Sequence, residues 1–223
     1  MKSNLHVPIR KPEDIIPFLG TGEKHWRKGY SAQELAESWF KAKGFAQPVT
    51  QVLESCPEFS GAELLGGCFE RDVDLRTAGA ASQTDLMIVA GLKSGIAIIA
   101  VEGKVKEALG QLVEKWNDHS KGKERRLAAL CETLGLKVQQ VNDLRYQLLH
   151  RTASAVYEAQ RYRTAHALML VHSFSQENSW FDDFGKFSER MGIPVSQPNR
   201  ISDAKDCETV SLRLGWVKDK PAA

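Results

Sequence analysis

The 223-residue sequence lacks the features that mark secreted proteins, membrane proteins and zinc-binding modules. Its four cysteines are far apart and form no C-x-x-C pair, so neither a structural zinc site nor a disulfide framework is expected. No run of about 18 apolar residues occurs, and the first residues contain no long apolar segment. We therefore expect a cytoplasmic protein with no membrane span and no secretory signal.

An excess of one charge is also missing. The formal net charge is only +2, so the total charge does not predict nucleic-acid binding. Local basic clusters at residues 121–126 and 161–163 could contact phosphate, although a solvated helix face is the simpler interpretation. The apolar fraction of 42% is ordinary for a folded protein, and the length fits one domain.

Two short apolar runs in the middle of the chain carry most of the information about the fold. Leu86–Ala90 and Ile96–Val101 are rich in Ile and Val, and the five residues between them include Gly91 and Gly95. Short apolar runs bounded by glycine or charge are typical of buried strands. The short connection predicts that the two strands pair as an antiparallel hairpin.

Charged residues stand at the two positions that such a hairpin brings together. Asp85 comes just before the first run, and Glu102 and Lys104 follow the second. Residues i and i+2 of a strand share a face, so Glu102 and Lys104 should project together beside Asp85. Two carboxylates on rigid strands suit Mg²⁺, and a nearby lysine can hold a water or offset charge on a phosphate. The alternative is an exposed ion pair and an aspartate that caps a turn.

The remaining periodicity predicts an α/β fold in the order helix, three strands, helices, strand, helix, strand. Strands are predicted at Ala62–Phe69, Ala165–Phe174 and Val210–Val217, besides the central pair. Helices are predicted at Ser31–Gly44, Pro48–Ser55, Val105–Trp116, Arg125–Leu134, Val141–Arg163 and Trp180–Met191. Ser31 and Glu34 predict a capping box for the first helix. His166 and His172 are interpreted as ordinary strand residues rather than metal ligands.

This order of elements, with an acid at the second strand and E-x-K at the end of the third, resembles the PD-(D/E)XK nuclease superfamily. The strings SAQELAESW, SQTDLM, VEGKVKEALG and YQLLHRTAS resemble, more narrowly, an uncharacterised bacterial branch of it. The resemblance implies a three-layer restriction-endonuclease-like core of helix, three strands, helix and strand, with extra helices and a C-terminal strand. We expect a single domain over residues 1–223, with an irregular lead-in at 1–30, the nuclease-like core at 31–174, and a C-terminal helix and strand at 175–223.

The resemblance also implies roles for the central residues. Asp85 and Glu102 would be metal ligands, and the backbone carbonyl of Gly103 would complete a site for Mg²⁺ or Mn²⁺. Lys104 would position the attacking water or stabilise the transition state. The proline that names the motif is absent, because Thr84 precedes Asp85.

Helical residues would support this site, by the same resemblance. Glu37 of the first helix is the candidate for an additional acid, since Glu34 is assigned to the capping box. Gln147 on the long helix would support the metal site, and His150 or Arg151 would contact phosphate. Arg151 stands four residues after Gln147, where a tyrosine is common in some branches.

The expected function is therefore metal-dependent hydrolysis of phosphodiester bonds in nucleic acid, in the first place DNA, by an enzyme whose activity rises from acid toward neutral or mildly alkaline pH. A homodimer would be in keeping with such nucleases. The main alternative is a nuclease-like fold that binds or assembles without cleavage, motivated by the near-neutral charge and the aromatic stripe at Trp180–Phe187. The third hypothesis is a hydrolase of small phosphoesters, or another acid-dependent reaction, on an unrelated α/β fold.

Overall fold

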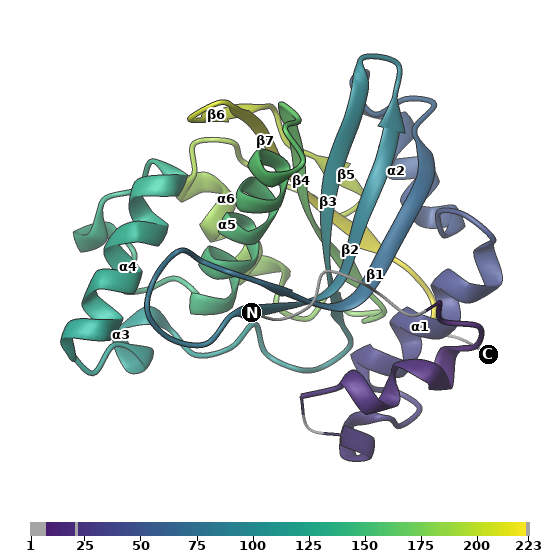
Figure 1. Cartoon of the computed structure of the whole chain (residues 1–223), viewed down its shortest axis with the longest axis horizontal. Coiled ribbons are helices and arrows are strands. Elements are labelled where there is room, and N and C mark those ends of the chain that lie inside the picture. The colour runs from purple at the N-terminus through teal and green to yellow at the C-terminus, as the bar shows by residue number, and fades with distance from the viewer. Residues whose placement is uncertain (1–7, 21, 222–223) are drawn as a thin grey trace.

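The computed structural model describes residues 8–20 and 22–221, which form an α/β fold around one mixed sheet of seven strands (Figure 1). Residues 1–7 of the predicted lead-in lie outside this part of the chain. The strand order is β1-β2-β3-β4-β7-β5, and β6 pairs with the first residues of β7. The strands are β1 (Glu63–Val73), β2 (Ser82–Leu92), β3 (Gly95–Lys104), β4 (His166–Ser173), β5 (Arg200–Ile201), β6 (Lys205–Cys207) and β7 (Val210–Lys218).

The first three strands form an antiparallel meander, which confirms the predicted hairpin. Leu86 of β2 pairs with Val101 of β3, and the turn between the two strands is Lys93-Ser94. The next two strands run parallel to β3: β4 pairs with β3, and β7 pairs with β4. The carboxyl ends of β3, β4 and β7 therefore lie side by side, at the same end of the sheet's strands.

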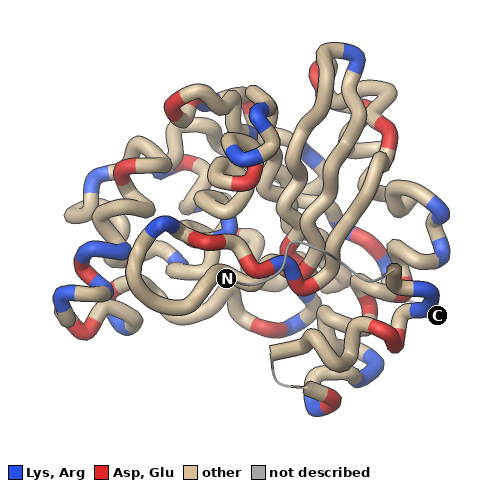
Figure 2. The backbone as a smooth tube through the Cα atoms, viewed as in Figure 1, with Lys and Arg blue, Asp and Glu red and all other residues tan. Residues whose placement is uncertain are grey.

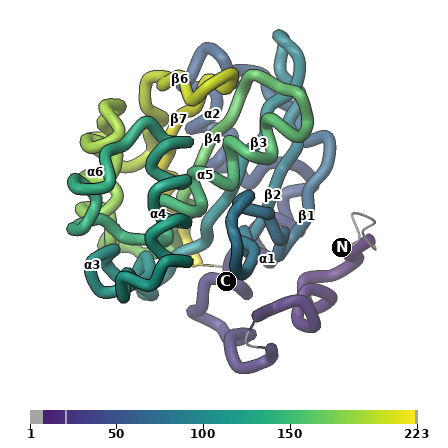
Figure 3. Tube along the Cα trace, turned by 60° about the vertical axis from the view of Figure 1, so that its left-hand side comes forward, coloured from purple at the N-terminus to yellow at the C-terminus, as the bar shows by residue number. Residues whose placement is uncertain are grey.

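Helices cover both faces of the sheet because the strands alternate their apolar side chains between two cores. In β3, Ile99 and Val101 pack toward α1 and α2, whereas Ile98 and Ala100 pack toward α4, α5 and α6. Figure 3 shows α4, α5 and α6 gathered on one side of the sheet. The α-helices are α1 (Ser31–Ala42), α2 (Gln47–Glu54), α3 (Val113–Trp116), α4 (Lys121–Leu134), α5 (Tyr146–Arg161) and α6 (Phe181–Arg190), and short 3-10 helices occur at Pro12–Phe18, Gly22–His25 and Val138–Gln140.

None of the described helices is both long enough and apolar enough to cross a membrane. The aromatic stripe of α6 belongs to the core, since Phe184 and Phe187 are fully buried against the sheet. His166 and His172 both lie in β4, as expected of strand residues. His172 is completely buried, where its Nδ1 accepts a hydrogen bond from Trp39 Nε1 at 3.1 Å.

The helix predicted between Val105 and Trp116 is wrong over most of its length. Residues 105–112 are irregular, and only α3 is helical. The apolar residues of this segment belong to different faces of the sheet: Val105 packs in the core that includes α1, and Leu109 in the core that includes α5. Their helical spacing therefore does not reflect one apolar helix face. The backbone instead bonds to the segment before α5, which consequently begins five residues later than predicted.

The predicted capping box at the start of α1 is also wrong. Ser31 is the first helical residue rather than the N-cap, and its N–H donates to Glu107 Oε1 at 2.8 Å. The Glu34 carboxylate instead accepts from the N–H of Gly29 at 2.8 Å. A glutamate 76 positions away in the chain therefore caps α1, which fixes this helix to the loop that follows β3.

Replacing Glu107 with alanine should lower the free energy of unfolding at pH 7 by about 1–2 kcal/mol, the usual value of a helix cap. Burial opposes ionisation of Glu107, but hydrogen bonds from the N–H groups of Ser31 and Val105 outweigh it and lower its pKa. A lowered folded pKa means that the stabilisation is present above pH 4.5 and is lost as the pH falls further. Urea denaturation at pH 7 and pH 3.5 would measure this difference, with Glu114→Ala on α3 as an exposed control; equal effects of the two changes would contradict the cap.

Candidate active site

Asp85, Glu102 and Lys104 project from the same face of the meander. Met87 of β2 and Ala100 of β3 pack toward the α5 core. Asp85 is two residues before Met87, and Glu102 and Lys104 are two and four residues after Ala100, so strand alternation places all three charged side chains under α5. Figure 2 shows acidic and basic positions meeting at the lower ends of β1, β2 and β3, below the uncharged bodies of β2 and β3.

The three predicted residues are linked directly or through one backbone group. Lys104 Nζ lies 2.7 Å from Glu102 Oε1, and both side chains are almost fully buried. Asp85 Oδ2 accepts a hydrogen bond from the N–H of Gly103 at 2.9 Å, and 21% of the Asp85 side chain is exposed. The cluster thus has one solvent-accessible acid and one buried acid–lysine pair.

Helix α5 closes this cluster with two side chains spaced one turn apart. Gln147 Nε2 donates to Glu102 Oε1 at 2.6 Å, and Arg151 Nε donates to Glu102 Oε2 at 2.5 Å. Arg151 Nη2 is 3.7 Å from Asp85 Oδ1. Glu102 therefore accepts from Lys104, Gln147 and Arg151, and the guanidinium lies between the two carboxylates.

Ser82 and His150 form a second layer behind Arg151. Ser82 Oγ accepts from Arg151 Nη1 at 3.0 Å and lies 2.8 Å from His150 Nδ1. Arginine can only donate, so Ser82 Oγ is the acceptor in its bond with Arg151, whereas the donor in its bond with His150 depends on the tautomer of the histidine. Burial, and next the charge of Arg151, lower the pKa of His150 well below its usual value. His150 was a candidate for contact with phosphate. In the structure it bonds to Ser82, which in turn bonds to Arg151.

Glu37 is the predicted site residue that the structure does not bring to the cluster. It lies on α1, where its Oε1 accepts from Gln33 Nε2 at 2.6 Å. Within the described residues, no hydrogen bond or ion pair joins Glu37 to the central acids or to Lys104. The reason is the sheet itself, because α1 packs on the face of Gly103, where an added Cβ would lie 3.4 Å from Leu35.

Glu70 is a member of the cluster that the sequence interpretation missed. Strand β1 was expected to end at Phe69 but continues to Val73. The register pairs Phe69 with Leu86 and Arg71 with Thr84, which leaves Glu70 opposite Asp85. Its backbone has φ of 52°, a left-handed conformation that is costly for a residue other than glycine and is frequent at functional sites. The charged sequence Glu70-Arg71-Asp72, directly after Phe69, is the signal from which a further acid near the end of this strand could have been predicted.

The charges and the burial of the cluster shift the pKa values of Asp85 and Glu102 in opposite directions. Burial favours protonation of Glu102, but Arg151 and Lys104 outweigh it and lower the pKa of Glu102 to about 2. Burial and then the charge of Glu102 raise the pKa of Asp85 to about 6. Burial alone would lower the pKa of Lys104, but Glu102 and Asp85 raise it, so the ammonium is charged at neutral pH. Near neutrality, Asp85 and Glu102 are both ionised beside two cations.

Glu70→Gln should stabilise the protein at pH 8, raising the melting temperature by about 2–4 °C, the shift that 1 kcal/mol produces in a chain of this size. Burial, followed by the charge of Asp85, raises the pKa of Glu70 from 4.5 to about 9. With a raised folded pKa, stability falls as the pH rises from about 4.5 to 9, because folding disfavours the charged form. Thermal unfolding at pH 5 and 8 would test this, with exposed Glu63→Gln on the same strand as control. A gain no larger at pH 8 than at pH 5 would contradict the assignment.

The donor atoms of the cluster fit a hard divalent cation. The carboxylates of Asp85 and Glu102 are joined by the carbonyl of Gly103, which points toward β2 as its N–H does, since the two groups of a strand residue lie on one side. Near neutral pH the charges of Asp85 and Glu102 are balanced by Lys104 and Arg151, and Glu70 is protonated because its pKa is about 9. Within the described residues no three acidic, histidine or cysteine side chains form a ready-made metal site. A guanidinium, that of Arg151, lies between Asp85 and Glu102.

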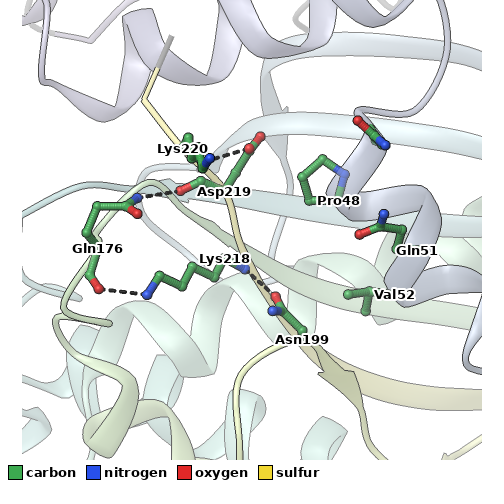
Figure 4. A pocket seen from close by; sticks show the side chains of 9 residues that line it. Pro48, Gln51, Val52, Gln176, Asn199, Lys218, Asp219 and Lys220 are labelled. Carbon is green, nitrogen blue, oxygen red and sulfur yellow. Dashed lines mark hydrogen bonds between the residues drawn. The ribbon is translucent and has the colours of Figure 1, made fainter. Parts of the chain in front are cut away.

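A separate pocket of about 540 Å³ lies between α2 and the end of β7 (Figure 4). Amide and lysine side chains line it, and Lys218 Nζ donates to the backbone oxygen of Gln176 at 2.7 Å. Asp219 is the one acid in this lining, and its Oδ2 lies 3.1 Å from Nε2 of the buried His172. The pocket therefore lacks a pair of carboxylates, which the cluster under α5 has, and that cluster is the candidate active site.

Comparison with known proteins places the chain in a family without assigning it an activity. Residues 8–221 match the family described as Domain of unknown function (DUF6946), so the chain belongs to that family. No curated protein matches the sequence. No solved structure matches it either.

Proposed function

We propose that this member of the DUF6946 family hydrolyses phosphodiester bonds in nucleic acid, in the first place DNA, with Mg²⁺ or Mn²⁺ as cofactor. The observation that carries the proposal is the meeting of Asp85, Glu102 and Lys104 at one end of the meander. Acid pairs beside a charged lysine are suited to holding a metal and to offsetting the charge of a phosphate undergoing attack.

The order of elements supports the same proposal. Helix α1 precedes an antiparallel meander of three strands, and α5 then leads into β4, which is parallel to β3. This is the order of the PD-(D/E)XK core that the sequence resembles. Helices α3 and α4 are inserted between β3 and α5, so they extend such a core without interrupting its sheet.

In the proposed reaction each residue of the cluster has a distinct role. Asp85, Glu102 and the carbonyl of Gly103 would hold the cation, which when bound would polarise a phosphoryl oxygen and make a bound water more acidic. Lys104 is charged and fixed by Glu102, so its ammonium would orient a nucleophilic water and neutralise developing charge. Gln147 fixes the orientation of Glu102 from α5.

Divalent binding tests the proposal directly. Calorimetric titration of Mn²⁺ should give an affinity that Asp85→Asn weakens at least about tenfold. Because Asp85 must be ionised and its pKa is about 6, wild-type binding at pH 5 should be about tenfold weaker than at pH 7. Cleavage of single- and double-stranded DNA and RNA should then require the same metal. Mn²⁺ binding that is independent of both Asp85 and pH would contradict the assignment.

A second function, nucleic-acid or partner binding without cleavage, is favoured by one feature. Both oxygens of Glu102 are already engaged by Lys104, Gln147 and Arg151, as in a purely structural ion network. The aromatic stripe of α6 no longer supports this alternative, because Phe184 and Phe187 are buried. Nucleic-acid binding that is insensitive to divalent ions, with no cleavage of any substrate, would favour it.

A further inference from the structure

Arg151 makes polar contacts through all three of its nitrogens, each with a different group. Nε meets Glu102 at 2.5 Å, Nη1 meets Ser82 at 3.0 Å, and Nη2 faces Asp85 at 3.7 Å. Only 8% of the residue is exposed. It occupies the space between the two carboxylates that the proposed function assigns to a metal.

This position has a consequence for cation binding. A guanidinium is permanently charged, so it repels a divalent ion that approaches the same carboxylates. A planar guanidinium also forms paired hydrogen bonds with phosphate, which makes phosphate a suitable alternative partner for Arg151. Its contact with Asp85 is the longest of the three, and Asp85 is the more exposed of the two acids.

We propose that Arg151 is an exchangeable counter-ion of this site: a divalent cation displaces it from Asp85 and Glu102, and a substrate phosphate receives it. This inference rests on the proposed function and deepens it. Metal and phosphate then bind cooperatively, each strengthening the other by the same factor. The substrate class that fits is a strand with phosphodiester anions on both sides of the scissile bond, because a neighbouring phosphate can hold Arg151 while the metal binds.

The first arm of the test measures Mn²⁺ binding without substrate. Arg151→Gln should bind Mn²⁺ at least about tenfold more tightly than the wild type, whereas Arg151→Lys, which keeps the charge, should bind like the wild type. Ser82→Ala should give an intermediate gain, since it loosens Arg151 without changing any charge. Arg161→Gln at the other end of α5, where Arg161 pairs with Glu158, is the matched control and should leave the affinity unchanged.

The second arm measures coupling to a phosphate strand. A short DNA oligonucleotide with phosphorothioate linkages, which resist hydrolysis, should tighten Mn²⁺ binding to the wild type at least about fivefold. The same oligonucleotide should have little effect on the affinity of Arg151→Gln. Neither arm requires turnover, so the readout is independent of catalysis.

The outcomes separate this inference from the proposed function. If Asp85→Asn removes Mn²⁺ binding but Arg151→Gln binds no more tightly than the wild type, the exchange is refuted and the metal site stands. If no variant binds Mn²⁺ with or without the oligonucleotide, both are refuted. If Arg151→Gln fails to fold, Ser82→Ala decides, and an unchanged affinity in that variant overturns the exchange.

Discussion

Replacing Lys104 with methionine should lower the rate of metal-dependent phosphodiester cleavage by about 100- to 1,000-fold, the usual cost of removing one group that stabilises transition-state charge. Methionine retains the length and apolar stem of the side chain while it removes the ammonium that lies 2.7 Å from Glu102. Mn²⁺ binding should persist in this variant, because Lys104 is not among the proposed ligands. Single-turnover cleavage of labelled DNA at saturating metal would measure the effect.

The matched control is Lys106→Met, two residues further along the chain. Lys106 is exposed in the irregular segment after β3, so this variant should retain nearly the full rate. A melting temperature measured for both variants would show whether lost activity reflects lost folding. Full activity in a folded Lys104→Met protein would remove the lysine from the mechanism and with it the main support for phosphodiester hydrolysis.

Glu102→Ala should have the largest effect on stability, lowering the free energy of unfolding by about 3–5 kcal/mol. The substitution leaves two buried cations, Lys104 and Arg151, without their closest carboxylate, and it leaves the amide of Gln147 without its acceptor. The low pKa of Glu102, which those cations cause, implies that the carboxylate is ionised throughout the range of ordinary buffers. Urea denaturation at pH 7 would give the difference.

An exposed ion pair provides the comparison for this experiment. Lys186 and Asp143 lie 2.7 Å apart, but 46% and 47% of their side chains are exposed, so Lys186→Ala should cost less than about 1 kcal/mol. If Glu102→Ala were as mild as Lys186→Ala, the cluster would be solvated rather than buried. If Glu102→Ala were stabilising, the prediction would be refuted, because the cost of burying the charged cluster would exceed the attraction among its members.

The central part of the site was predictable because it depends on local geometry. Asp85, Glu102 and Lys104 are brought together by a hairpin whose two strands are adjacent in sequence and marked by their apolar runs. The spacing of Gln147 and Arg151 on one helix was visible as well. That both reach Glu102 was not visible, since this depends on how α5 crosses the sheet.

The errors arise where tertiary contacts replace local signals. Glu70 was missed because charged residues near the end of a strand resemble the start of a loop, yet β1 continues through them beside β2. Glu37 was favoured as a helical acid, but only the packing of α1 reveals that it lies across the sheet from α5. The true cap of α1, Glu107, is separated from Ser31 by three strands, and no pattern of nearby residues indicates it.

The position of β7 in the sheet bears on how the chain folds during its synthesis. This strand is the last to be made among the described residues, yet it lies inside the sheet between β4 and β5. Until residues 210–218 leave the ribosome, β4 is an unpaired edge of mostly apolar residues, which is a template for aggregation. The meander, α5 and the active-site cluster are all encoded before β4. A nascent chain would therefore contain every candidate catalytic residue while β4 still lacks one of its two neighbouring strands.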